Sequence, residues 1–173
     1  LAVKLKDKMK VKYLIEREHE IVPRVFHALE KIPGLRILAE NIENRLAIFS
    51  FAIAGLHYNL AVRLLNDLFG IQTRGGCACA GTYGHYLFNI AREQSKEITD
   101  RIDQGDLSTK PGFIRFSFHP IISNQEIDYV ASALRTIAAN FPKYAKDYAY
   151  NPRTNEFSHR QEKKFSIKVE PFF

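Results

Sequence analysis

The chain has 173 residues, of which 46% are hydrophobic and 25% are charged. This is the composition of a globular domain and excludes a disordered chain, and no apolar run reaches the roughly 20 residues that a membrane span needs. The formal net charge is +6. Because the excess lies in residues 1–12 and after residue 142, it does not favour a nucleic-acid-binding surface on the folded body.

The only two cysteines are Cys77 and Cys79. Two cysteines one residue apart do not form a disulfide framework, so we expect a reducing, cytoplasmic compartment. The chain begins with Leu1 and not with methionine, and we therefore expect it to be a fragment or a processed piece.

The first secondary-structure signal is a helix. Apolar residues recur at helical spacing from residue 11 to residue 29. Pro23 lies inside this pattern and should kink or interrupt the helix, and Pro33-Gly34 should stop the chain from continuing it. Residues 1–12 alternate between lysines and apolar residues, which by itself leaves strand and helix both open.

Two strands and a helix follow. Residues 35–38 and 45–53 are dense in residues that favour strands. Leucines at helical spacing over residues 56–68 predict a helix that Gly70 should cap. Residues 71–73 read as a further short strand that runs directly into a glycine-rich loop.

The residue pattern in the second half of the chain predicts further helix, one strand and a final helix. Helical spacing continues through residues 86–91 and around residues 98–102, and residues 113–118 predict a strand. Ser123 and Glu126 have the spacing of a capping box. They begin a long helix that we expect Pro142 to end.

This order of elements predicts a small two-layer α/β domain with a three- to four-stranded sheet covered by helices. We assign residues 1–142 to the domain. Residues 143–173 form a polar tail with interspersed aromatic residues, which we expect to pack on the domain.

The densest chemical signal is the loop from Arg74 to Gly81, in which glycines flank the segment that contains Cys77 and Cys79. A nearby arginine and a following helix N-terminus would both favour a thiolate. Burial of two small cysteines is the structural alternative. A metal site made by the two cysteines and His85 is disfavoured, because structural zinc needs four ligands and usually a wider cysteine spacing.

Arg115 is the second signal, since it interrupts an otherwise aromatic and apolar strand pattern. A guanidinium drawn into such a strand needs an anion. A bound carboxylate or phosphate and an internal ion pair with Asp or Glu satisfy this need equally well. His57, His85 and His119 lie near the ends of predicted elements, where they can cap helices as readily as they can act in catalysis.

Several segments together resemble the class V aminotransferases, and within them the cysteine desulfurase and selenocysteine lyase branch. The resemblance extends from about Leu1 to Phe157 and also favours a helix near Leu1. The segments are RLAIFSF (45–51), GLHYN (55–59), GIQTRGGCACAGTYGH (70–85) and KPGFIRFSFHP (110–120).

The resemblance implies that this chain is the smaller, C-terminal domain of a fold-type I enzyme that uses pyridoxal phosphate. In that family the larger N-terminal domain carries most of the cofactor pocket and the Schiff-base lysine, and no motif in this chain resembles that lysine segment. The resemblance therefore implies that the isolated chain is inactive, that the missing large domain is its partner, and that the intact enzyme is a homodimer.

The resemblance also assigns roles to individual residues. Cys79 matches the catalytic cysteine, whose thiolate attacks the sulfur or selenium of the cofactor-bound amino acid to give a persulfide and alanine. Arg115 matches the arginine that binds the substrate carboxylate, and Arg74 matches the arginine that opens the catalytic loop. Cys77 and His85 are accessory candidates.

One departure keeps other functions open. Cys77-Ala78 stands where desulfurases of this type commonly carry two histidines. The alternatives are therefore the small domain of a class V aminotransferase, or of another amino-acid lyase without sulfur transfer, and a separately expressed, non-catalytic binding module.

Overall fold

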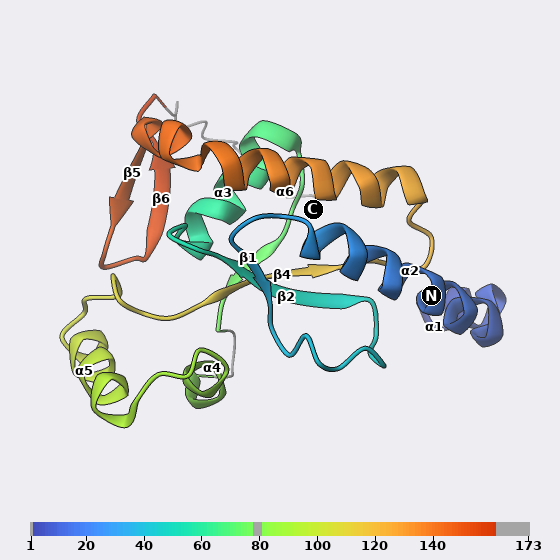
Figure 1. Ribbon diagram of the computed structural model, residues 1–173, viewed down its shortest axis with the longest axis horizontal. Helices are drawn as coiled ribbons and strands as arrows, with labels where there is room; N and C mark the ends of the chain where they lie inside the picture. The colour runs from blue at the N-terminus through green and yellow to red at the C-terminus, as the bar shows by residue number, and fades with distance from the viewer. Residues whose placement is uncertain (1, 78–80, 162–173) are drawn as a thin grey trace, which may run out of the picture.

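A four-stranded antiparallel sheet forms the centre of the structure, a computed structural model that describes residues 2–77 and 81–161 (Figure 1). The strands lie in the order β1-β2-β4-β3. Their bounds are β1 (Leu35–Ile37), β2 (Ile48–Ile53), β3 (Arg74–Gly76) and β4 (Phe113–Ser117). Helices cover this sheet, which confirms the predicted two-layer α/β domain.

Three helices cover one face of the sheet: α2 (Val11–Glu30), α3 (Tyr58–Phe69) and α6 (Asn124–Tyr144). Side chains alternate along β2, so that Phe49, Phe51 and Ile53 are buried beneath these helices while Ser50 faces the other way. Phe49 contacts Phe26 of α2 edge to face, with ring centroids 5.1 Å apart. The main core therefore lies between the sheet and α2, α3 and α6.

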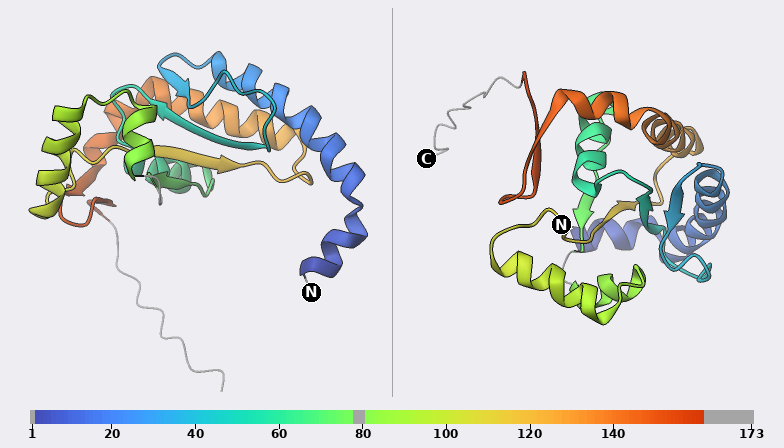
Figure 2. Two further views of the ribbon diagram at one scale, coloured as in Figure 1. Left: turned by 90° about the horizontal axis from the view of Figure 1, so that it is seen from below. Right: turned by 60° about the vertical axis from the view of Figure 1, so that its left-hand side comes forward.

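The remaining elements lie around this core. They are α1 (Ala2–Met9), α4 (Gly81–Leu87), α5 (Arg92–Asp103), the short 3₁₀ helix η1 (Ala145–Asp147) and a hairpin of β5 (Tyr148–Asn151) and β6 (Glu156–His159). Figure 2 shows α1 and α2 at the opposite end of the domain from α5 and the hairpin. Among the described residues, no helix is long and apolar enough to cross a membrane.

The helix over residues 11–29 is confirmed, but Pro23 does not interrupt it. The break lies instead at Lys10, which has a φ of 60° and separates α2 from α1. The helix that the family resemblance favoured near Leu1 is confirmed by α1.

Three further boundary predictions were wrong. Residues 71–73 are not a strand, because the Ile71 amide donates to the Leu65 carbonyl at the end of α3 and pairing with β4 begins only at Arg74. Residues 90–91 lie between α4 and α5, since Asn89 adopts a left-handed φ of 53°. The last helix continues past Pro142 to Tyr144.

Pro142 is accommodated because its neighbours hold the last turn of α6 in place. Phe141 and Tyr144 pack against the core, and the Ala145 amide donates to the Phe141 carbonyl. These contacts offset the one hydrogen bond that proline cannot make.

The capping box at the start of α6 gives a direct test of the fold. The Ser123 hydroxyl accepts a hydrogen bond from the Glu126 amide, and the Glu126 carboxylate accepts one from the Ser123 amide at 2.7 Å. Ser123→Ala should lower the free energy of unfolding by about 1 kcal/mol, measured by urea denaturation. Ser132→Ala, at an exposed position within the same helix, should change it much less, and equal losses would contradict the capping role.

Candidate functional site

Three polar side chains lie in one row across the open face of the sheet. Arg115 of β4 lies directly opposite Ser50 of β2 on one side and opposite Arg74 of β3 on the other. Because Ile114 and Phe51 on these strands are buried beneath the helices, Arg115, Ser50 and Arg74 share the opposite face of the sheet. The structure thus brings together the two arginines that the sequence singled out.

This row borders an open hollow of about 580 Å³. Arg115, Arg45, Ser50 and Cys77 line it together with apolar side chains of β2, β4 and α4 and of the loop between β1 and β2. The apolar lining residues include Leu38, Ile42, Leu46, Ile48, Tyr83, Leu87 and Phe113. The hollow therefore combines guanidinium groups with an apolar wall, as a site for a small anionic molecule requires.

The positive charge of Arg115 is not neutralised within residues 2–77 and 81–161. The Arg115 side chain is half-buried. Among these residues it has no carboxylate partner and makes no side-chain hydrogen bond. Of the two readings left open by the sequence, the internal ion pair is thus not found in the described part of the chain. Like charges directly opposite each other on neighbouring strands are destabilising. Arg74, exposed on the neighbouring strand, adds positive charge to the same face, so this face of the sheet favours a bound anion.

The cysteine loop is only partly described. Cys79 lies outside the described residues, so its predicted role stays a prediction. Cys77 is buried, and its thiol donates to the Pro111 carbonyl at 2.7 Å. This contact fits the structural alternative for Cys77 and fixes the residue at the base of the loop.

The histidines occupy element ends, as the sequence suggested. His57 is the N-cap of α3 and accepts the Asn59 amide at Nδ1. His85 bonds Ser95 between α4 and α5, and His119 accepts the Ile121 amide in a turn. Within the described residues, no group of three or more His, Cys, Asp or Glu side chains is placed to hold a metal ion.

Two residues that the sequence analysis did not single out lie near the base of the cysteine loop. Tyr58 of α3 and Asn155, in the turn between β5 and β6, are both buried and hydrogen-bonded to each other. Burial raises the pKa of the Tyr58 hydroxyl, so the group stays a neutral hydrogen-bonding partner. In the sequence, only Gly75 and Gly112, which face the Tyr58 ring, could have indicated that a bulky side chain packs at this place.

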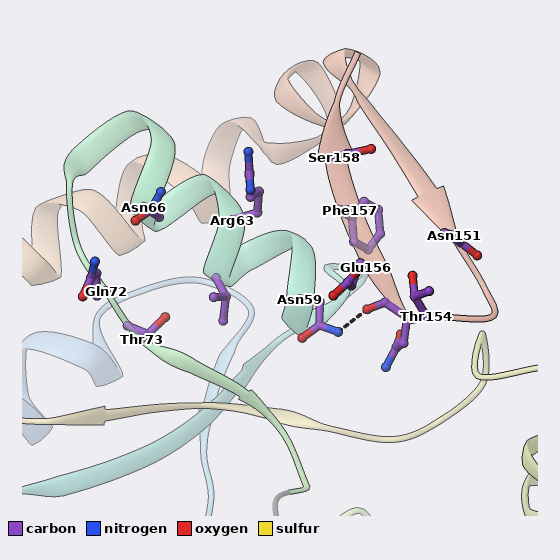
Figure 3. A pocket seen from close by; sticks show the side chains of 12 residues that line it. Asn59, Arg63, Asn66, Gln72, Thr73, Asn151, Thr154, Glu156, Phe157 and Ser158 are labelled. Atoms are coloured by element: carbon purple, nitrogen blue, oxygen red, sulfur yellow. Dashed lines mark hydrogen bonds between the residues drawn. The ribbon is translucent and has the colours of Figure 1, made fainter. Parts of the chain in front are cut away.

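A second, polar hollow of about 870 Å³ lies between α3 and the hairpin (Figure 3). Asn59, Arg63 and Asn66 of α3 line one side, and residues 154–158 line the other. The Asn59 side chain donates to the Asn155 carbonyl across it. This contact ties the hairpin turn to the first turn of α3.

Comparison with known proteins identifies the class to which this fold and site belong. A family model described as "Aminotransferase class-V" matches residues 1–130. The chain belongs to this family, as the sequence resemblance implied. No curated protein sequence matches the chain.

The solved structures that are similar to the chain include two cysteine desulfurases. One is the apo cysteine desulfurase from Thermococcus onnurineus NA1, at 17% identity and a TM-score of 0.56 over 80% of this chain. The other is the cysteine desulfurase CsdA (S-sulfonic acid) from Escherichia coli, at 20% identity and a TM-score of 0.47 over 73% of this chain. The chain spans only 29% and 25% of their lengths. At this identity, the first likeness supports the fold.

Members of the family use pyridoxal phosphate, but the described part of the hollow does not fit that cofactor. No lysine lines it, so it supplies no amine for a Schiff base. The guanidinium groups can bind a carboxylate or a phosphate through paired hydrogen bonds. The described lining of this hollow therefore offers positive charge for an anionic group but no covalent anchor for the cofactor.

The charge of Arg115 gives a test on the isolated chain. Low-millimolar sodium sulfate should raise the Tm above that in sodium chloride of equal ionic strength, because an anion that binds only the folded state stabilises it, by about 1.4 kcal/mol at ten times its Kd. Arg115→Gln should lose this gain. Arg135→Gln, at an exposed position on α6, should keep it, and a gain that survives Arg115→Gln would contradict an anion site here.

His57 predicts how stability depends on pH. Burial lowers the pKa of His57 below its ordinary value of 6.5, so below about pH 6.5 the unfolded chain takes up the proton more readily and stability falls with the pH. Protonation would also remove the Nδ1 acceptor of the helix cap. His57→Asn keeps an acceptor but does not titrate, and should flatten the fall in Tm between pH 7 and pH 5. An unchanged slope would contradict this assignment, and His19→Asn serves as an exposed control.

Proposed function

We propose that this chain is the C-terminal domain of a pyridoxal-phosphate-dependent cysteine desulfurase or selenocysteine lyase, and that it binds the substrate carboxylate and supplies the sulfur-accepting thiol. The observation that carries the proposal is the placement of Arg115 and Arg74 opposite each other on the open face of the sheet. Arg115 is half-buried without an anionic partner in the described residues, and it faces Arg74 across the strand pair. Family membership and the sequence of the cysteine loop support the same reading.

In this proposal Arg115 binds the α-carboxylate of the amino acid through the two parallel hydrogen bonds that a guanidinium can donate. Arg74 adds positive charge on the same side, and Ser50 offers a hydroxyl in the same row. The apolar residues that line the hollow lower the effective dielectric constant around Arg115, which strengthens these interactions.

Cys79 follows the short strand that carries Arg74, only five residues further on. Its thiolate would attack the sulfur of the substrate cysteine. A sulfur–sulfur bond forms on Cys79, the carbon–sulfur bond of the substrate breaks, and protonation of that carbon yields alanine. Selenocysteine would react in the same way through selenium.

We further propose that the missing N-terminal large domain supplies the cofactor-binding lysine, and that the intact enzyme is a cytoplasmic homodimer. The chain spans only 29% of the length of the Thermococcus onnurineus desulfurase, which supports a larger parent protein. Residues 1–142 would form the small domain and residues 143–173 its C-terminal extension. The isolated chain should then release neither alanine nor sulfide from L-cysteine and added pyridoxal phosphate.

The complete open reading frame that contains this chain tests the proposal. With L-cysteine and pyridoxal phosphate it should form alanine and a protein persulfide in equal amounts, and Cys79→Ala should abolish both products. Arg115→Lys keeps the charge but loses the paired hydrogen bonds, so KM for cysteine should rise about tenfold or more, since a charged hydrogen bond contributes about 1.5–3 kcal/mol.

Cys77→Ala, which removes the neighbouring buried thiol, should lower turnover much less than Cys79→Ala. If Cys79→Ala keeps full turnover, the sulfur-transfer assignment is wrong and an aminotransferase or another lyase is indicated. If the reading frame contains no lysine that binds pyridoxal phosphate, the chain is a non-catalytic module.

A further inference from the structure

Two glycines near the cysteine loop lie against the ring of Tyr58. A Cβ atom on Gly112 would lie 2.4 Å from Cε1 of this ring, and one on Gly75 would lie 3.1 Å from Cδ2. Neither glycine has a left-handed φ, so close approach of neighbouring atoms excludes a side chain there. At Gly112 these atoms belong to the Tyr58 ring, and at Gly75 they belong to this ring and to Asn59, whose Oδ1 would lie 2.8 Å from the Cβ. Tyr58 therefore supports both β3 and the segment that leads into β4.

Asn155 holds the hydroxyl of Tyr58. Its side-chain amide donates to the Tyr58 hydroxyl, and its side-chain carbonyl accepts from the Tyr150 hydroxyl at 2.9 Å. Asn155 is only 7% exposed and adopts a left-handed φ of 58°, a conformation that asparagine tolerates better than most residues. The turn of the hairpin thus places a buried polar side chain at the end of the tyrosine.

The same contacts lead directly to the cysteine loop. Gly75 is two residues before Cys77, and Gly112 follows Pro111, whose carbonyl accepts the Cys77 thiol. The hairpin also contacts the preceding loop, because the Leu107 amide donates to the Pro152 carbonyl at 2.9 Å. A chain of contacts therefore connects Asn155, in the hairpin, with both segments that flank the base of the loop.

We propose that Asn155 and Tyr58 form a positioning pair that holds Arg74 opposite Arg115 and keeps Cys77 buried at the base of the loop. This inference deepens the proposed function and rests on it, since it is the catalytic arrangement that the pair positions. Neither residue lines the hollow beside Arg115. Both act through the backbone of β3 and of residues 111–112.

The test uses the 173-residue chain. It measures the rate at which iodoacetamide alkylates Cys77, and peptide mass spectrometry separates this rate from that of Cys79. Tyr58→Phe removes the hydroxyl and keeps the ring. Asn155→Gly removes the side chain and keeps the left-handed turn. Both variants should raise the Cys77 rate about tenfold or more, because local opening exposes groups that the closed state protects.

Tyr148→Phe is the matched control. It removes a tyrosine hydroxyl from the same hairpin, one that donates to Asp67 at 2.9 Å and does not contact β3 or β4. Compared at equal distances below each Tm, this variant should keep the parent's Cys77 rate. An equal rise in Tyr148→Phe, or no rise in either test variant, would overturn the positioning pair.

A second readout separates positioning from general destabilisation. The gain in Tm that sulfate produces depends on Arg74 and Arg115 lying side by side, so it should shrink in Tyr58→Phe and Asn155→Gly and persist in Tyr148→Phe. A full gain in both test variants would overturn the proposal. If Cys77 opens as expected but the complete enzyme forms no alanine from cysteine, the pair stands and only the proposed reaction fails.

Discussion

The opposition of Arg74 and Arg115 is the constraint on which the candidate site depends. Two guanidinium groups on directly paired positions repel each other, and within the described residues no carboxylate relieves the charge of Arg115. The fold nevertheless holds them together, because Ile114 of β4 and Phe118 just after this strand are buried in the core and β3 has no other strand to pair with. An anion bound in the hollow would offset the charge of Arg115, which lines it.

The geometry of β3 shows how such a short strand stays in register. It has three residues, two of which are glycines, and glycine weakens a strand by leaving it without packing side chains. The missing side chains are what admits the Tyr58 ring, since any Cβ on Gly75 would crowd it. The packing of α3 beneath the sheet therefore supplies the order that β3 does not have by itself, and the hairpin in turn fixes the tyrosine.

Local signals predicted most of the fold. The capping box of Ser123 and Glu126, the left-handed Gly70 and the strand over residues 113–117 are each specified by a few neighbouring residues. The errors arose where packing or hydrogen bonds to residues outside the segment itself outweighed such signals. Pro142 did not end α6, because Phe141 and Tyr144 pack on the core, and residues 71–73 are held by α3 and not by the sheet.

The site was less accessible to sequence reasoning for the same physical reason. An arginine in an apolar strand requires an anion, but the strand itself does not say whether that anion is a distant side chain or a ligand. Only the register of β4 with β2 and β3 shows which groups surround Arg115. Asn155 is a stronger case, since its partners Tyr58 and Asn59 lie nearly a hundred residues away in the chain. Its burial depends on how the hairpin packs against α3, so no local pattern around residue 155 contains that information.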